Sequence, residues 1–174
     1  LVGGLGGMQG LVGWWMVSSG LVGDMVRVAS YRLAPHLGLA FLILMVIGWY
    51  AMLLGRSEAD LLRARREGDG RLAGLAGVVL TVGFVQVLLG ALVAGIDAGR
   101  GFTDWPLMGG DWLPPDPFSI QPLWRNFFED PGLVQFDHRV GGYLLFIAAV
   151  TVALRGRRSP HASVRVAFAW MGAW

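Results

Sequence analysis

Residues 133–154 read LVQFDHRVGGYLLFIAAVTVAL, and this stretch decides the fold class. The polar cluster QFDHR at residues 135–139 lies at the threshold of an apolar run that continues to about Leu154. A run of this length spans a hydrocarbon core of roughly 30 Å as an α-helix. Because ionisable side chains are costly at the edge of a membrane helix, His138 is a candidate functional residue.

The composition of the whole chain agrees with a membrane protein. Hydrophobic residues make up 55% of the 174 residues, and the mean hydropathy is +0.56. The 27 glycines follow no collagen-like period, and in apolar helices small residues allow close packing. We therefore expect an all-α, polytopic membrane helical bundle. Cysteine is absent, which excludes disulfides and thiolate ligands, and nothing in the charge pattern implies nucleic acid.

Four long apolar segments and the start of a fifth follow one another along the chain. They are residues 1–22, 33–54, 72–98 and 133–154, and the fifth begins near Val164. Loop 55–71 holds five arginines and the next loop on that side holds four, whereas the loops 23–32 and 99–132 hold two each. The positive-inside rule places the first pair of loops in the cytoplasm and the second pair on the outer side.

The long outer loop 99–132 has two open interpretations. From Phe102 to Pro131 it is rich in Pro, Trp, Phe and Asp. Loops of this length are often lids or binding surfaces. Alternatively, its aromatic side chains lie at the level of the lipid headgroups.

A faint internal repeat joins the two halves of the chain. QGLVG at residues 9–13 is followed by an outer loop and His36, and QVLLG at 86–90 is followed by a longer outer loop and His138. Two copies of one helical hairpin suggest a duplicated bundle. Both histidines follow an outer loop closely and should lie near the outer surface. Gln9 and Gln86 should lie roughly 18 Å below the outer helix ends, which favours an interhelical hydrogen bond over contact with an iron near that surface.

The residue types near the two histidines favour haem binding. A neutral imidazole is a good ligand for haem iron, and helical bundles commonly hold haem between facing helices. Arg32 and Arg139 are suited to bind the haem propionates, while Asp137 is suited to orient an imidazole or to pair with Arg139. The alternative for a membrane-edge histidine is an interfacial anchor. His161, in a basic loop, is interpreted as a solvated loop residue.

Four motifs in order resemble one known family. They are QGLVGWWMVSSGL at residues 9–21, YRLAPHLGLA at 31–40, GALVAGIDAG at 90–99, and NFFEDP at 126–131 leading into VQFDHR at 134–139. Together they closely resemble the haem A synthase family, particularly its proteobacterial and mitochondrial branch. The resemblance covers essentially the whole chain.

The resemblance implies eight transmembrane helices in two similar four-helix halves, with a pair of histidines in each half. This chain resembles helices three to six and the start of seven, so we expect an internal fragment of a longer chain. Residues 1–54 then form the second hairpin of the substrate-haem half, and 55–71 form a cytoplasmic arginine-rich loop. Residues 72–154 form the first hairpin of the haem b half, with the outer loop 99–132, and 155–174 form a cytoplasmic loop and the start of the next helix.

By the same resemblance, His36 is a ligand of the substrate haem iron and His138 is a ligand of the haem b iron. Their partner histidines, and an acidic residue proposed to help catalysis, belong to parts of the family's fold that this chain does not match. Pro35 departs from the alanine expected before the histidine, but proline is tolerated near a helix start. Asp97 either faces the haem edge or caps loop amides.

The family converts haem O to haem A for cytochrome oxidase assembly by oxidising a ring methyl to a formyl group, through successive hydroxylations and with electrons from a reductant. The implied cofactor is haem b and the implied substrate is haem O. Haem O synthase, an electron donor and a second copy of the chain are possible partners. The implied location is the bacterial inner membrane, or the mitochondrial inner membrane in a eukaryote, with the haem sites near the outer, periplasmic face.

Two other functions are weighed against this one. A b-type cytochrome subunit for electron transfer would use His36 and His138 as ligands of a single haem. A transporter built on duplicated hairpins would place its polar site near the bilayer midplane. The ionisable residues of this chain gather instead at the outer edge, which makes the transporter the weakest of the three.

Overall fold

The structure is a computed structural model that describes residues 1–18 and 28–172. Within these ranges the regular elements are helices, and Met108 and Asp111 form an isolated β-bridge. The long helices are α1 (Val2–Val17), α2 (Ser30–Leu54), α4 (Gly70–Gly95) and α6 (Pro131–Gly156). The shorter elements are α3 (Glu58–Glu67), η1 (Ala98–Arg100), η2 (Leu123–Arg125), α5 (Asn126–Glu129) and α7 (Ala162–Met171).

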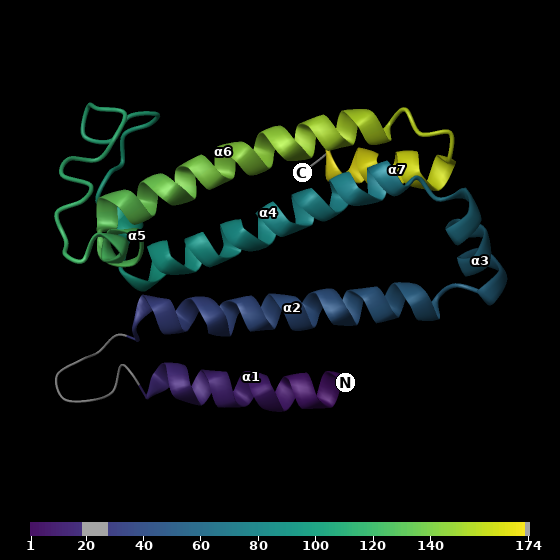
Figure 1. Cartoon of the computed structure of the whole chain (residues 1–174), viewed down its shortest axis with the longest axis horizontal. Helices are drawn as coiled ribbons and strands as arrows, with labels where there is room; N and C mark the ends of the chain where they lie inside the picture. The colour runs from purple at the N-terminus through teal and green to yellow at the C-terminus, as the bar shows by residue number, and fades with distance from the viewer. Residues whose placement is uncertain (19–27, 173–174) are drawn as a thin grey trace.

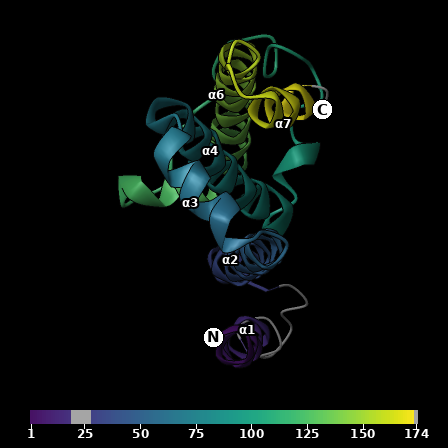
Figure 2. The ribbon, with the colours of Figure 1, turned by 90° about the vertical axis from the view of Figure 1, so that its right-hand side faces the viewer.

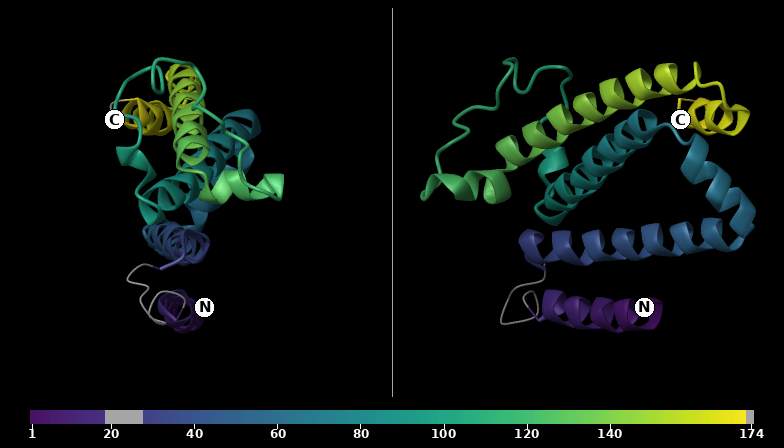
Figure 3. Two further views of the ribbon diagram at one scale, coloured as in Figure 1. Left: turned by 90° about the vertical axis from the view of Figure 1, so that its left-hand side faces the viewer. Right: turned by 45° about the vertical axis from the view of Figure 1, so that its right-hand side comes forward.

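The long helices lie side by side in the order α1, α2, α4, α6 and alternate in direction (Figure 1). Seen from the end, they form an open row in which each helix packs on its neighbours (Figure 2). Figure 3 shows α7 folded back against the end of α6. The expected all-α membrane bundle is confirmed.

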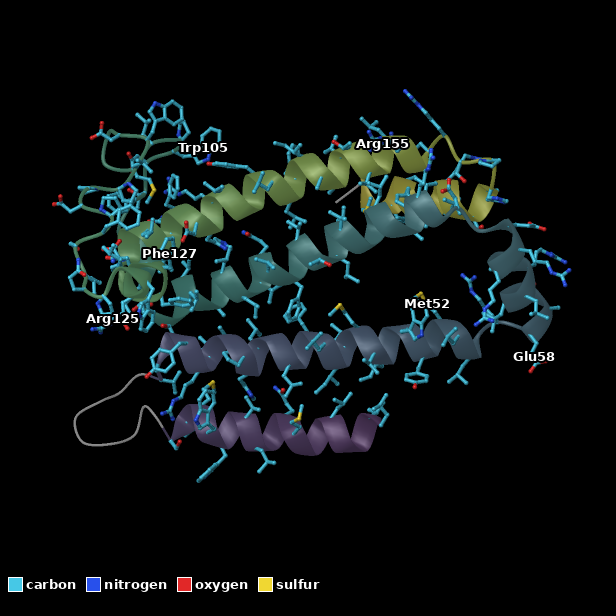
Figure 4. All side chains as sticks on the ribbon, in the orientation of Figure 1. Met52, Glu58, Trp105, Arg125, Phe127 and Arg155 are labelled. Atoms are coloured by element: carbon cyan, nitrogen blue, oxygen red, sulfur yellow. The ribbon has the colours of Figure 1, made fainter. Side chains whose placement is uncertain are left out.

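The loops divide between the two ends of this row. α3 and the link from α6 to α7 lie at one end, and the segment between α4 and α6 lies at the other (Figure 1). Figure 4 places Glu58 at the first end, and Trp105, Arg125 and Phe127 at the second. The predicted alternation of the loops is therefore present in the fold. We call the second end the outer-loop end.

The predicted spans agree closely with the helices. α2, α4 and α6 are each long and apolar enough to cross a membrane, with mean hydropathies of 2.4, 2.3 and 1.4. α1 is a helix of 16 residues, and the end of the first predicted segment, residues 19–22, lies outside the described residues. The loop predicted over 55–71 contains the helix α3, which was not predicted because this charged segment has no long apolar run.

Acidic caps begin two of the spans. Asp69 Oδ1 accepts hydrogen bonds from the backbone N–H groups of Arg71 at 2.9 Å and Leu72 at 3.1 Å. Asp130 Oδ1 accepts one from the Leu133 N–H at 2.7 Å, directly before the proline that begins α6. Such caps pair amides that the helix itself leaves free. The second cap fixes the start of α6 and thereby the position of His138 along it.

The buried core is small and lies toward the outer-loop end. It consists of small and medium side chains from the start of α2, the end of α4, η1 and the start of α6: Ala34, Ala91, Leu92, Ala98 and Val134. Elsewhere large apolar side chains stay exposed, with Leu44 at 61% and Phe146 at 69%. Lipid is the solvent that such surfaces require.

Two glycines set how closely α2 and α4 approach. A Cβ atom built on Gly38 would lie 2.8 Å from Leu88 Cδ2. A Cβ atom on Gly95 would lie 2.7 Å from Ser30 Cβ and 2.8 Å from Ser30 Cα. At Gly95 the obstacle includes backbone, which cannot turn aside. This contact therefore holds the end of α4 against the start of α2.

Replacing Gly95 with alanine should destabilise the protein. The added methyl group collides with the Ser30 backbone, and overpacking of this kind costs about 1–3 kcal/mol. Thermal unfolding of the full-length protein in detergent should show a lower Tm for Gly95→Ala. Gly74→Ala, on the same helix with no atom within 4 Å of the new Cβ, is the matched control. Equal Tm values for the two variants would contradict this account.

Candidate functional site

His36 lies in the second turn of α2 and faces α1. The Gln9 Nε2 atom donates to the His36 backbone oxygen at 3.2 Å and lies 3.3 Å from the ring Nδ1 and 3.4 Å from Nε2. One turn along α1, a Cβ atom on Gly13 would lie only 2.9 Å from His36 Cε1. The imidazole therefore rests directly on the backbone of α1.

His138 repeats this arrangement between α4 and α6. The Gln86 Nε2 atom donates to the His138 backbone oxygen at 2.9 Å and lies 3.0 Å from Nδ1 and 3.5 Å from Nε2. A Cβ atom on Gly90 would lie 3.2 Å from His138 Cε1. Each hairpin thus places a glutamine and a glycine, four residues apart, against the histidine of the next helix. We call each set of three residues a histidine cradle.

The expected interhelical hydrogen bond of each glutamine is confirmed, and its partner is the histidine itself. The depth predicted for Gln86 was too large, because α4 ends at Gly95 and not at Ala98, so Gln86 lies roughly 13 Å from the helix end. His138 lies roughly 10 Å into α6, which brings both to nearly the same level. For Gln9, the predicted helix end at residue 22 lies outside the described residues. The sequence feature that indicates the cradles is the shared four-residue spacing of Gln and Gly in the two repeats.

Arg32 joins α2 to the end of α1. Its guanidinium donates to the Trp15 backbone oxygen at 2.9 Å and to Ser18 Oγ at 3.5 Å, and it lies 4.7 Å from the Trp15 ring centroid. The positive charge therefore sits at the negative end of the α1 dipole. Its buried Nε–H group has no hydrogen-bonding partner among the described residues. Arg32 and His36 lie four residues apart on α2, as predicted.

Arg139 holds the outer loop instead of pairing with Asp137. Its Nη1 and Nη2 atoms each donate at 2.9 Å, to the backbone oxygens of Leu107 and Phe102. The Gln135 Nε2 atom donates to the same Phe102 oxygen at 2.8 Å. Together these bonds fasten residues 102–107 to the first turns of α6, beside His138. We call them the loop clasp, and sequence reasoning missed them because their acceptors are backbone atoms.

The other predicted residues are placed as follows. Asp137 is half-buried on α6, and its carboxylate makes no hydrogen bond or ion pair with another described residue. Asp97 follows α4 in the left-handed backbone conformation, with φ of 54°, at the outer-loop end. His161 directly precedes α7 and is half-buried. The start of α7 lies at the end of the row opposite the outer-loop end (Figure 1), so His161 lies far from both cradles.

The outer loop is an ordered cover built on its own polar contacts. Asn126 is fully buried: its Oδ1 accepts from the Ile120 N–H at 2.9 Å, and its Nδ2 donates to the oxygens of Ile120 and Leu123 at 2.8 Å each. Asp104 Oδ2 accepts from the Gly110 N–H at 3.1 Å. Hydrogen bonds from the Gly109 and Gly110 amides hold the pKa of the Asp104 carboxyl below its ordinary value. These contacts give the loop a fixed internal structure.

Replacing Arg139 with glutamine should release the loop from α6. Hydrogen bonds from a charged donor contribute about 1.5–3 kcal/mol each, so amide exchange in residues 102–108 should rise roughly tenfold or more. Hydrogen–deuterium exchange with mass spectrometry on the full-length protein measures this. Arg125→Gln is the control, because Arg125 pairs with Glu129 within the loop. Unchanged exchange in Arg139→Gln would refute the loop clasp.

The turn at Asp104 should loosen in acid. Because the pKa of Asp104 is depressed on folding, its stabilising contribution is present above the ordinary value of 3.8 and is lost as the pH falls through the lower, folded value. Fluorescence of the neighbouring, exposed Trp105 should therefore change below about pH 3.8. In Asp104→Asn this transition should be absent. An identical titration in both proteins would show that Asp104 does not hold the turn.

The cradles suit a metal ion that a cofactor already holds, so that the protein needs to supply only one or two further ligands. Among the described residues, no group of three His, Cys, Asp or Glu side chains could hold a metal ion. A haem iron needs only axial ligands from the protein, and imidazole is a common one. The cradles offer one half-buried imidazole each, on separate helix pairs.

Comparisons with known proteins agree with this arrangement. Residues 1–174 match the family described as cytochrome oxidase assembly protein, COX15-CtaA. The heme A synthase of Ruegeria sp. is 63% identical over 166 residues, covering 94% of this chain and 44% of that protein. Those of Paracoccus denitrificans and Dinoroseobacter shibae are 61% and 60% identical over 171 residues, covering 98% of this chain and 45% of theirs.

No solved structure matches the chain. The chain spans less than half the length of these curated relatives. Because the family match covers every residue, and because three apolar helices are long enough to cross a membrane, this chain is part of a multi-pass membrane protein that belongs to the cytochrome oxidase assembly protein family.

Proposed function

We propose that the protein containing this chain is a haem A synthase, an oxidoreductase that converts haem O to haem A. The family membership and the names of the relatives support this proposal. The observation that carries it is the duplicated histidine cradle, with one imidazole held in each of two hairpins. A protein that binds a substrate haem and a separate resident haem needs two such sites.

The residues of each cradle fit a haem. The imidazole supplies the nitrogen ligand, and the glycine beneath it lets the ring lie against the neighbouring helix. Each glutamine keeps a buried Oε1 atom with no partner among the described residues. When bound, haem iron supplies the redox chemistry. The chain binds and orients it, with His36 assigned to the substrate haem iron and His138 to the haem b iron.

Two arginines are assigned to the haem propionates, because a guanidinium pairs well with a carboxylate. They are Arg32 and Arg139. Arg139 also holds the loop clasp, so propionate binding would tie the haem to the cover above it. Asp137, which is half-buried on the same turns of α6, is assigned to orienting a group of the bound haem.

The structure favours two haem sites over one haem shared by His36 and His138. The His36 ring rests on α1, while the His138 ring rests on α4. α2 lies between α1 and α4 in the row (Figure 2), so the two imidazoles belong to different helix interfaces. The b-type cytochrome with one bridging haem is therefore the weaker proposal.

The setting of the protein follows from the same proposal. It would lie in the bacterial inner membrane, or in the mitochondrial inner membrane of a eukaryote, with both cradles toward the outer face. Haem O synthase would supply the substrate and an electron donor would supply reducing equivalents. A homo-oligomer is also proposed.

Histidine substitutions in the full-length protein test the proposal. His138→Ala should lower the content of haem b in the purified protein by at least about tenfold, since it removes an axial ligand. His36→Ala should keep haem b but lose haem A production in cells that also express haem O synthase. Extracted haems, separated by chromatography, give both readouts.

His161→Ala is the control, because His161 lies far from both cradles and should leave haem b content and haem A production unchanged. The proposal fails if His138→Ala keeps its full haem b content and its haem A production. If instead the unaltered protein carries haem b but yields no haem A beside haem O synthase, the b-type cytochrome becomes the better description.

A further inference from the structure

A pocket with a mainly apolar lining lies at the corner where α2 meets α3, at the end of the row opposite the cradles. Its volume of about 720 Å³ falls in the range of about 300–1,000 Å³ that is typical of pockets for small ligands. The apolar lining comes from Trp49, Met52 and Leu53 of α2 and from Leu61 and Leu62 of α3. Trp49, Met52 and Leu62 are each more than half exposed. We call this hollow the corner pocket.

The turn between the two helices is held by its own hydrogen bonds. The Gly55 N–H donates to the Ala51 oxygen at 3.3 Å, which closes the end of α2. Ser57 Oγ accepts a hydrogen bond from the Asp60 N–H at 3.2 Å and donates one to the Asp60 carboxylate at 2.6 Å. These bonds cap the start of α3 directly after α2, so the two walls of the corner pocket keep a fixed relation to each other.

The corner pocket lies at the level of the membrane surface. The 25 residues of α2 extend over roughly 37 Å, which exceeds a hydrocarbon core of roughly 30 Å, so the last turns of α2 reach the headgroup region. α3 crosses the end of the row between α2 and α4 (Figure 1). Figure 4 places Met52 on α2 and Glu58 further out, at the end of the row. The apolar side of the pocket therefore lies toward the acyl chains of the lipid, and the charged side lies toward the headgroups.

Two arginines line the pocket beside these apolar residues. Arg56 follows the end of α2, and Arg65 lies on α3. Their guanidinium groups form no hydrogen bond or ion pair with another described residue. Glu58 is the only acidic side chain among the described residues that line the pocket, so positive charge exceeds negative charge there. A guanidinium binds a phosphate group through two parallel hydrogen bonds, and its stem can lie along an apolar surface while its charge reaches the headgroups.

We propose that the corner pocket binds an anionic phospholipid, with an acyl chain against the apolar lining and the phosphate group held by Arg56 and Arg65. Basic pockets beside membrane helices are suited to anionic lipid headgroups. A zwitterionic lipid would fill the apolar part equally well, but its cationic group would face the two arginines. A free phosphate ion would leave the apolar part uncovered. This inference is independent of the proposed function, because no residue of the cradles takes part in it.

Lipid titration of the full-length protein in detergent, followed by native mass spectrometry, tests the inference. Dioleoylphosphatidylglycerol should bind about tenfold or more tightly than dioleoylphosphatidylcholine, because only the first carries a net negative charge. Replacing both arginines, Arg56→Gln with Arg65→Gln, should weaken the binding of dioleoylphosphatidylglycerol by about tenfold or more. Glu58→Gln removes a repulsive charge and should strengthen that binding by about twofold or more. A role limited to folding does not predict shifts of opposite sign.

The matched control is Arg66→Gln with Arg71→Gln. It removes two exposed arginines near the same end of the row, and neither of them lines the corner pocket. Its affinity for dioleoylphosphatidylglycerol should stay within about twofold of the unaltered protein, because distant exposed charges are screened by salt. An equal loss in the control and in the paired Arg56 and Arg65 variant would show only a general attraction to a basic surface, and would overturn the inference.

Three further outcomes decide the remaining alternatives. Inorganic phosphate in excess should leave the lipid bound, and complete displacement would overturn the inference, because the arginines alone would then account for binding. Equal affinities for the two lipids would also overturn it. If the paired arginine variant fails to fold, as measured by thermal unfolding, Arg65→Gln and Glu58→Gln decide. Weaker binding in the first and stronger binding in the second support the inference, and any other pattern refutes it.

Discussion

A polar side chain inside a membrane helix must find its hydrogen-bonding partner on a neighbouring helix, because lipid offers none. In this chain that constraint is met twice, by a glutamine on one helix and a histidine on the next. Interhelical hydrogen bonds of this kind average only about 0.6 kcal/mol. They therefore do little to hold the fold together. Their main consequence is to fix where, and in which orientation, each imidazole lies.

Close packing and this orientation depend on the same residues. The glycines at 13 and 90 remove the side chains that would otherwise occupy the space of each imidazole. Gly95 lets the end of α4 meet the Ser30 backbone, and the Asp130 cap fixes the start of α6. The small core at the outer-loop end joins these contacts. The helices are thus held most firmly at the level of the two cradles, while large apolar side chains along the rest of their length stay exposed.

The parts of the structure that follow from local sequence were predictable. Apolar runs predicted α2, α4 and α6, arginine loops predicted the alternation of ends, and the repeat predicted that His36 and His138 are equivalent. Contacts between distant segments were not predictable in the same way. The loop clasp depends on backbone oxygens at Phe102 and Leu107. Every residue has a backbone oxygen, so the residue types at these positions do not reveal the contact. The depth of Gln86 was overestimated because the prediction needed the end of α4 to within one turn.

The differences between the two cradles agree with their proposed division of labour. In the second cradle the glutamine lies closer, at 3.0 Å from Nδ1 against 3.3 Å in the first. The residue after His138 is an arginine that fastens the outer loop over this hairpin, whereas Leu37 follows His36. A permanently bound group benefits from a tight ligand and a fastened cover, since both slow its escape. A substrate must enter and leave, which a looser cradle allows, so the asymmetry fits the proposed assignment of haem b to His138 and haem O to His36.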